Sequence, residues 1–260
     1  MSENNNINVT ILGSGTCVPS LTRSSCSVFV KIGQSKILID SGAGTMHRLL
    51  ETGNTIFDIT HIFYSHFHPD HISELIQFIF SNKYSGTAER ENPLTITAGD
   101  GFKSFYKGLK AVFGQWIEFA PGMMNIIELN IIGSDSIGFN DFKIKSIPMK
   151  HTSESLAFRI IGPNGKSMVY SGDTDMNDNL VEIAKGADLL ICESAFPDDL
   201  KTEGHMTPSL AGKVASEAGV GKLVLTHLYP ECDDVDIEKE CRKTYDGPLV
   251  IAEDLMEIVI

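Results

Sequence analysis

The sequence has no long hydrophobic run and no basic start followed by an apolar stretch. Its first ten residues are MSENNNINVT, and no later segment approaches the ~20 apolar residues that a membrane-spanning helix requires. We therefore expect a cytoplasmic protein that neither crosses nor binds a membrane.

Cysteine is scarce, and no two cysteines form a Cys-x-x-Cys pair. An odd number at wide spacings fits neither a disulfide framework nor a structural zinc site built from cysteine. We expect these side chains to be reduced, and most of them to be buried as small hydrophobic groups: Cys17, Cys26, Cys192, Cys232 and Cys241.

Positive charge is also limited, because 21 Lys and Arg face 34 Asp and Glu, a formal net charge of −13. A protein that grips a nucleic-acid backbone broadly needs clustered Lys and Arg. Lys103, Lys107 and Lys110 do recur at helical spacing, but three lysines without an arginine indicate a solvated helix face, with neighbouring aromatic residues in the core. Bound cations could still make a positive centre within an acidic protein.

The composition is otherwise that of an ordinary globular protein, with 42% hydrophobic residues in 260. That length suits one layered domain, which we expect to span residues 1–260. Strand and helix signals alternate without repeat or linker, which predicts two packed β-sheets with helices on both outer faces, a four-layer α/β sandwich. The strands are expected at 8–12, 27–32, 37–40, 61–65, 94–97, 142–147, 156–161, 167–171, 189–192 and 223–226, and the helices at 45–51, 71–83, 101–112, 179–185 and 208–218.

A cluster of polar residues directly follows the apolar segment that ends near residue 65. Within six residues it holds three histidines and a carboxylate: His66, His68, Asp70 and His71. Imidazole nitrogen and carboxylate oxygen are ligands that zinc accepts, and Pro69 suits the start of a helix. Four ligands so close in sequence cannot all enclose one tetrahedral ion. The cluster therefore predicts a second ion or ligands from distant segments.

Distant candidates exist, because His151, Asp173 and His227 each follow an expected strand. Loops at strand ends are where α/β proteins place reactive groups. His47 and His61 instead lie inside element patterns, and we assign them structural roles.

These motifs together resemble the metallo-β-lactamase superfamily, over nearly the whole chain. The matching features are Asp40 in Ile37-Leu-Ile-Asp40-Ser-Gly-Ala-Gly44, the cluster at 66–71, His151, Asp173 in Ser171-Gly-Asp-Thr174, and His227 in Leu225-Thr-His-Leu228. The resemblance implies that superfamily's αββα fold and two divalent metal ions. Zinc is the expected metal, with manganese and iron left open.

The resemblance also implies how the ligands divide. The first metal position takes His66, His68, His151 and Asp173. The second takes Asp70, His71 and His227, with Asp173 as a bridge. Asp40 would orient one of the ligands.

Within the superfamily the chain most resembles the ribonuclease Z group and its smaller phosphodiesterase relatives. The segments that carry this are Ile11-Leu-Gly-Ser-Gly-Thr16, Cys192-Glu-Ser-Ala-Phe196 and His205-Met-Thr-Pro208. By resemblance, His205 is the general acid, Glu193 supports it, and Asp70 holds and orients the nucleophile that two cations activate. The alternative for His205 is a surface histidine that caps the helix after Pro208.

The resemblance further implies a small or cyclic phosphodiester, or an RNA 3′ end, as substrate, and a homodimer. Transfer-RNA-processing members carry a long arm between the positions that match His151 and Asp173. Here residues 152–172 number only 21, enough for a hairpin that turns at Pro163-Asn-Gly165. Asp100 also stands where ribonuclease Z has proline. These departures argue against transfer RNA as the substrate, and not against the reaction type.

Three other functions fit the same ligands. One is hydrolysis of a lactone or sulfate ester, and another is a sensor that binds a ligand without catalysing a reaction. The intact ligand set and His205 argue against the sensor. The third is a redox role with iron.

Overall fold

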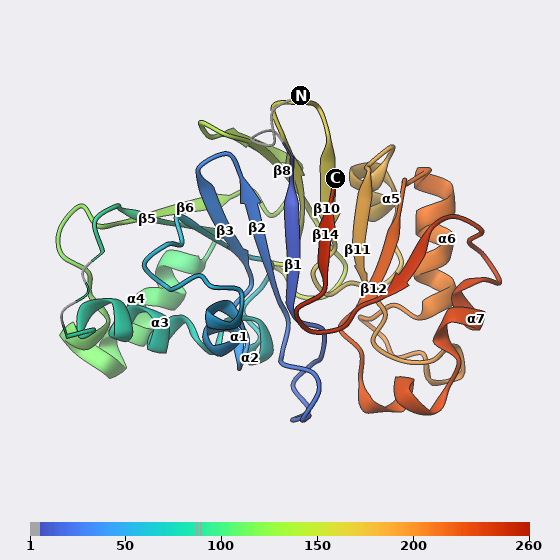
Figure 1. Cartoon of the computed structure of the whole chain (residues 1–260), viewed down its shortest axis with the longest axis horizontal. Coiled ribbons are helices and arrows are strands. Elements are labelled where there is room, and N and C mark those ends of the chain that lie inside the picture. Colours follow the sequence, from blue (N-terminus) through green and yellow to red (C-terminus); the bar gives the residue numbers. More distant parts are fainter. Residues whose placement is uncertain (1–5, 87, 89) are drawn as a thin grey trace.

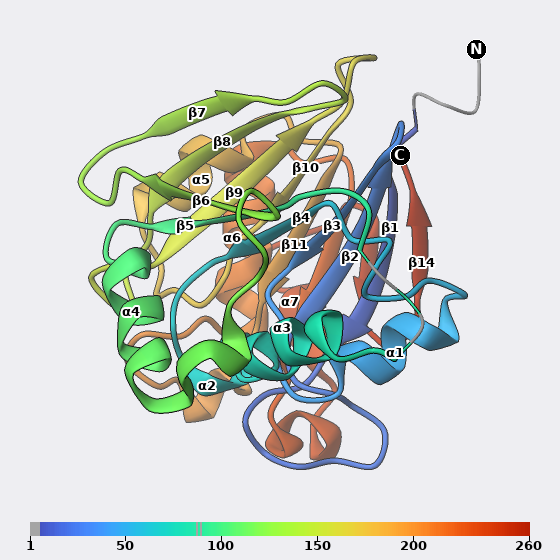
Figure 2. The same ribbon diagram turned by 90° about the vertical axis from the view of Figure 1, so that its left-hand side faces the viewer.

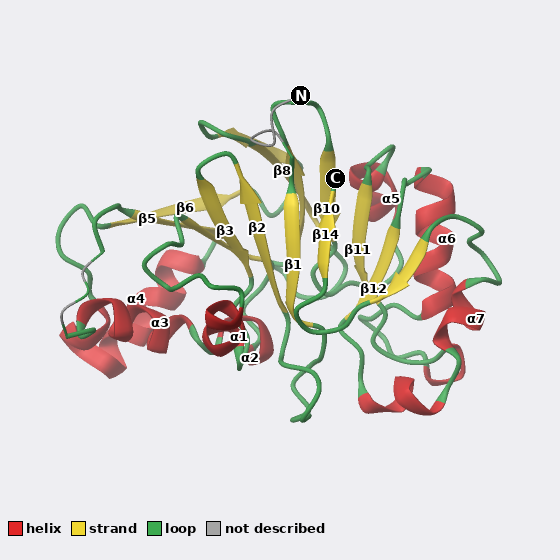
Figure 3. Ribbon diagram, viewed as in Figure 1, coloured by secondary structure: helices red, strands yellow, loops and turns green. Residues whose placement is uncertain are grey.

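Two seven-stranded sheets pack face to face, with helices on both outer faces, in a computed structural model that describes residues 6–86, 88 and 90–260 (Figure 1, Figure 3). The strand orders are β14-β1-β2-β3-β4-β5-β6 and β13-β12-β11-β10-β9-β8-β7. The four-layer α/β sandwich expected from the sequence is confirmed. Within the described ranges, no helix is both long and apolar enough to span a membrane.

The first sheet comes from the N-terminal half and the last strand of the chain. Its strands are β1 (Asn8–Gly13), β2 (Ser27–Ile32), β3 (Ser35–Ile39), β4 (His61–Tyr64), β5 (Leu94–Gly99), β6 (Met124–Leu129) and β14 (Glu257–Val259). From β3 to β6 neighbouring strands run parallel, whereas β14, β1, β2 and β3 pair antiparallel. Figure 2 shows β1 and β14 side by side. The helices on the outer face of the first sheet are α1 (Thr45–Glu51), α2 (Pro69–Ile72), α3 (Leu75–Lys83) and α4 (Phe102–Phe113).

The second sheet holds the rest of the chain. Its strands are β7 (Asp135–Gly138), β8 (Lys143–Pro148), β9 (Leu156–Ile161), β10 (Ser167–Tyr170), β11 (Leu189–Glu193), β12 (Leu223–Thr226) and β13 (Leu249–Ile251). Strands β10 to β13 run parallel, and β7 to β10 pair antiparallel. The helices are α5 (Asp178–Ala184), α6 (Pro208–Ala218) and α7 (Ile237–Cys241), with short 3-10 helices η2 (Gly114–Ile117), η3 (Asp198–Leu200) and η4 (Pro230–Asp234).

Alternating side chains explain why strands with continuous apolar sequence suit this architecture. In β3, Ile37 and Ile39 point into the core between the sheets, while Leu38 points to the helices outside. Both faces of the strand are buried, and each fully buried side chain of this kind stabilises the fold by about 1.5–3 kcal/mol. The same packing holds the strand ends, and therefore the loops that follow them, in fixed positions.

The helix expected over 71–83 is wrong in its boundaries, because the structure has two helices, α2 and α3, with a break at Ser73 and Glu74. The Glu74 carboxylate accepts hydrogen bonds from the backbone N–H groups of Gly44 and Met46, each at 2.7 Å. These bonds tie the break to the loop after β3. Local helical periodicity could not reveal a contact between segments that far apart.

Four strands were not predicted: β6, β7, β13 and β14. All four lie at or next to the edge of a sheet, and two have only three residues. Partly exposed strands such as Asp135–Gly138 have little of the apolar pattern that marks a buried strand.

Two sequence-based interpretations are confirmed. β9 and β10 form a hairpin that turns at residues 163–165, where Gly165 has φ of +81°. In α4, Phe102 and Tyr106 are buried, whereas Lys103 and Lys110 are ion-paired with Glu128 and Glu118. The α4 lysines are therefore a solvated helix face.

Candidate metal centre

The predicted ligands follow strands whose carboxyl ends meet at one edge of the two sheets. β3 is parallel to β4, and β10, β11 and β12 are parallel to one another. Consequently the loops after these strands converge. The side chains they carry are Asp40 after β3, the 66–71 cluster after β4, His151 after β8, Asp173 after β10, Glu193 at the end of β11 and His227 after β12.

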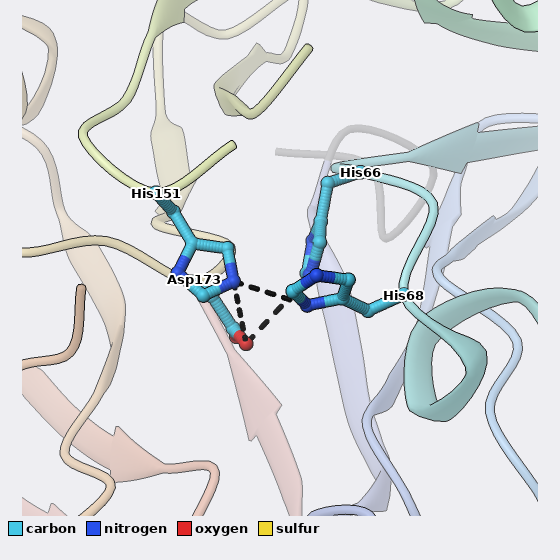
Figure 4. Close-up of side chains that lie close together, drawn as sticks. All are labelled: His66, His68, His151 and Asp173. Atoms are coloured by element: carbon cyan, nitrogen blue, oxygen red, sulfur yellow. Dashed lines mark hydrogen bonds and ion pairs between the residues drawn. The ribbon is translucent and has the colours of Figure 1, made fainter. Parts of the chain in front are cut away.

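The first group brings together His66, His68, His151 and Asp173, with one donor atom of each within 4.8 Å of the others (Figure 4). His68 Nδ1 lies 3.1 Å from His151 Nε2. Asp173 Oδ2 lies 3.8 Å from His66 Nε2 and 3.9 Å from His151 Nε2. His151 Nδ1 is 2.9 Å from the Gly204 carbonyl oxygen, so a proton donated there leaves Nε2 free to face the group.

The second group shares Asp173 with the first. Asp173 Oδ1 lies 3.2 Å from His71 Nε2, and its Oδ2 lies 3.3 Å from His227 Nε2. Asp70 Oδ2 is 3.6 Å from His227 Nε2 and 4.0 Å from His71 Nε2. The carboxylate of Asp173 therefore lies between the two groups, as a bridging ligand requires.

Asp40 lies beneath the second group and is fully buried. Its carboxylate accepts hydrogen bonds from His71 Nδ1 at 2.7 Å, from Ser65 N and Oγ at 2.8 and 2.7 Å, and from the Tyr170 hydroxyl at 2.9 Å. Bonding through Nδ1 directs His71 Nε2 toward Asp173. Ser65 and Tyr170 were missed from the sequence, because neither is a metal ligand type and each gains its role only through tertiary contact.

Close backbone approach at two glycines fixes the loops around the site. A Cβ on Gly42 would lie 2.0 Å from the carbonyl oxygen of Asp70. Gly172 has φ of +57°, and a Cβ there would lie 2.8 Å from Ser65 Cβ. Only glycine fits these positions without displacing the neighbouring segment.

Several buried polar atoms of the two groups have no hydrogen-bond partner among the described residues. They are His66 Nε2, His71 Nε2, both ring nitrogens of His227 and Asp173 Oδ1. Leaving such an atom unsatisfied costs about 1–3 kcal/mol. Divalent cations would satisfy the atoms that face the groups, and nitrogen with carboxylate oxygen is a donor set suited to zinc. The residues present therefore fit two divalent metal ions.

Electrostatics support ionised carboxylates in the centre. Burial works to raise the pKa of Asp173, but His227, His71 and His66 hold that pKa well below its ordinary value. Burial likewise opposes ionisation of Asp70, yet His227 and His71 lower its pKa. Both side chains are available as anionic ligands at neutral pH.

His205 and Glu193 lie beside the second group. His205 Nδ1 is 3.2 Å from both carboxylate oxygens of Glu193, and its ring stacks on that of His227 with centroids 5.5 Å apart. Burial lowers the pKa of His205, but contact with Glu193 outweighs burial and raises that pKa above its ordinary value. The alternative of a helix cap is wrong, because Thr207 is the N-cap of α6 and the His205 side chain contacts Glu193 instead.

Two histidines outside the site lie where the sequence analysis expected. His61 packs edge-on against Phe139 and Phe142, and burial lowers its pKa to about 4. His47 is exposed on α1. Of the cysteines, Cys17 is exposed and the other four are buried, and all five have free thiols, as expected.

Residues 35–228 match the model of a protein family described as Beta-lactamase superfamily domain. The chain belongs to this family. Ribonuclease Z of Methanosarcina mazei is 26% identical in an alignment of 316 positions, gaps included, that covers 98% of each protein. The resemblance to the ribonuclease Z group inferred from the motifs is confirmed.

Solved structures give the fold. The metallo-beta-lactamase fold protein YhfI from Bacillus subtilis matches with a TM-score of 0.83 at 23% identity, over 98% of this chain and 100% of that one. The short form of human tRNase Z matches with a TM-score of 0.76 at 24% identity, over 96% and 98% of the two chains. The structure thus has the metallo-β-lactamase fold.

Proposed function

We propose that the protein is a metal-dependent phosphodiesterase of the ribonuclease Z type that uses two divalent ions, with zinc as the metal. The observation that carries the proposal is the position of Asp173 between two ligand groups, with the His205–Glu193 pair beside them. Similarity to a ribonuclease Z over nearly the whole chain supports the reaction type.

When bound, two divalent cations lower the pKa of a water molecule and neutralise charge that develops on a phosphoryl oxygen. Asp70 holds and orients the attacking water, since its carboxylate is ionised and fixed beside His227. His205 donates a proton from Nε2 to the departing oxygen, because Glu193 holds Nδ1 and favours the protonated ring. The carboxylate that orients the nucleophile and the acid thus come from different segments, Asp70 from α2 and His205 from the loop before α6.

The substrate class we propose is a small or cyclic phosphodiester, or an RNA 3′ end. The segment between His151 and Asp173 forms the short β9–β10 hairpin. It is too short to include an arm that could bind the body of a transfer RNA. The net charge of −13 agrees with a small substrate. The homodimer and the cytoplasmic location stay predictions.

The test is hydrolysis of bis-p-nitrophenyl phosphate by zinc- or manganese-loaded protein, with Asp70→Ala and His205→Ala variants of confirmed metal content. We expect each variant to lose about 10²-fold or more in rate. His47→Ala is the control, since His47 is exposed on α1 outside the site. Metal-loaded wild type that preferred a lactone, or that hydrolysed none of these compounds, would contradict the proposal.

A further inference from the structure

Cys26 is a buried thiol beside the second ligand group. It immediately precedes β2 and is 1% exposed. Its Sγ and one ring nitrogen each of His71 and His227 all lie within 4.8 Å of one another. The thiol donates a hydrogen bond to the Gly15 carbonyl oxygen at 3.2 Å. Its backbone is anchored as well, because the Gly42 N–H donates to the Cys26 carbonyl oxygen.

The two histidines provide a second, independent sign of a ligand at this place. His71 Nε2 and both ring nitrogens of His227 are buried and have no hydrogen-bond partner among the described residues. Asp40 already bonds His71 Nδ1, which leaves Nε2 as the nitrogen that can bind an ion. One ring nitrogen of each histidine lies within 4.8 Å of the sulfur of Cys26, so the three side chains can contribute donor atoms to one ion.

We propose that Cys26 is a sulfur ligand of the second metal position, together with His71 and His227. This inference rests on the proposed use of metal, and it is independent of the substrate. On binding, a sulfur–metal bond replaces the S–H bond, the proton leaves to solvent, and the hydrogen bond to Gly15 is lost.

Charge balance favours an additional anion here. The carboxylates of Asp40, Asp70 and Asp173 surround Cys26 and would neutralise three of the four positive charges that two divalent ions bring, and a thiolate would neutralise the fourth. Uncompensated charge in a buried site costs free energy, so a Cys26 thiolate would increase the affinity of the site for the second metal ion.

The thiolate would also make the two metal positions different. The first group has only nitrogen and oxygen donors, whereas Cys26 adds a soft sulfur donor to the second. Soft thiolates favour zinc over manganese. Cys26 therefore predicts zinc at the second position even when manganese is supplied.

X-ray absorption of wild-type protein loaded with two zinc ions tests the proposal directly. We expect sulfur at ~2.3 Å from zinc, in addition to nitrogen and oxygen at ~2.0–2.2 Å, with about one sulfur for every two zinc ions. The Cys26→Ser variant should lose the sulfur signal. Cys17→Ser is the matched control, because Cys17 is the exposed thiol at the same end of the molecule, 3.4 Å from the Tyr229 hydroxyl. It should keep the signal.

A second readout is the competition between zinc and manganese for the second position. Cys26→Ser should lower zinc affinity by about tenfold or more, with a smaller change for manganese. Equal losses for the two metals would contradict a thiolate ligand.

The outcomes separate this inference from the proposed function. Wild-type protein that binds two zinc ions without a sulfur neighbour overturns the role of Cys26 and leaves the phosphodiesterase proposal intact. A sulfur signal that vanishes in Cys17→Ser overturns the assignment to Cys26. Protein that binds no metal overturns both proposals. If Cys26→Ser does not fold, the spectra of wild type and Cys17→Ser still decide.

Discussion

The contact between Glu193 and His205 predicts a specific change in the pH dependence of activity. Glu193→Gln keeps a side chain of similar shape but removes the negative charge 3.2 Å from His205 Nδ1. A hydrogen bond to a charged group contributes about 1.5–3 kcal/mol, which corresponds to about one to two pKa units. We therefore expect the pKa of His205 to fall by that amount.

The sign of the effect follows from the role of His205 as an acid. Glu193 raises the pKa of His205, so the protonated form persists to higher pH in the wild type. The same ion pair contributes to the free energy of unfolding. Its contribution is fully present below the pKa that His205 has in the unfolded chain, and it is lost as pH rises through the raised pKa of His205 in the folded protein. In Glu193→Gln, the basic limb of kcat against pH should move about one to two pH units lower, while the acidic limb should stay in place.

The assay is the pH profile of bis-p-nitrophenyl phosphate hydrolysis at saturating substrate and fixed metal content. Glu203→Gln is the control, because it removes the same charge from an exposed side chain two residues from His205. The two oxygens of the Glu193 carboxylate also accept hydrogen bonds from the backbone N–H groups of Thr174 and Met206. Glutamine is preferable to alanine because its amide oxygen can keep one of these two bonds. A basic limb that does not move in Glu193→Gln would refute the reasoning.

Two further predictions concern the scaffold of the site. Asp40→Asn weakens the hydrogen bond that orients His71, so it should reduce metal affinity at the second position by about 10–100-fold. Metal titration should show a nearly unchanged affinity at the first position. Equal losses at both positions would count against a role for Asp40 in orienting His71. Gly42→Ala places a Cβ against the Asp70 backbone and should destabilise the protein by about 1–3 kcal/mol in thermal unfolding. Gly108→Ala on α4 meets no described atom within 4 Å and should not destabilise; equal Tm values for these two variants would refute the steric argument.

Local sequence was sufficient to single out the 66–71 cluster, His151, Asp173 and His227, whereas Asp40, Glu193 and His205 were indicated by the resemblance to the family. The 66–71 cluster is contiguous, and His151, Asp173 and His227 each follow a strand with a clear apolar pattern. Parallel strand order then places these loops at one edge. Metal binding by these residues stays a prediction.

Other features depend on contacts between distant segments, which periodicity does not encode. Glu74 interrupts a helical pattern because its carboxylate bonds to the loop at Gly44. Tyr170 contacts Asp40 across 130 positions of sequence. Cys26 gave no signal beyond that of a small buried residue, and only the fold places it beside His71 and His227.

The proposed phosphodiesterase activity requires two metal ions, and Asp173 would be a ligand of both. The most direct test is the rate of bis-p-nitrophenyl phosphate hydrolysis while zinc is added stepwise to metal-free protein. We expect activity to rise until two zinc ions are bound per chain, and Asp173→Ala to lose both tight zinc binding and activity. Full activity with a single ion, or two tightly bound ions without phosphodiester hydrolysis, would contradict the account.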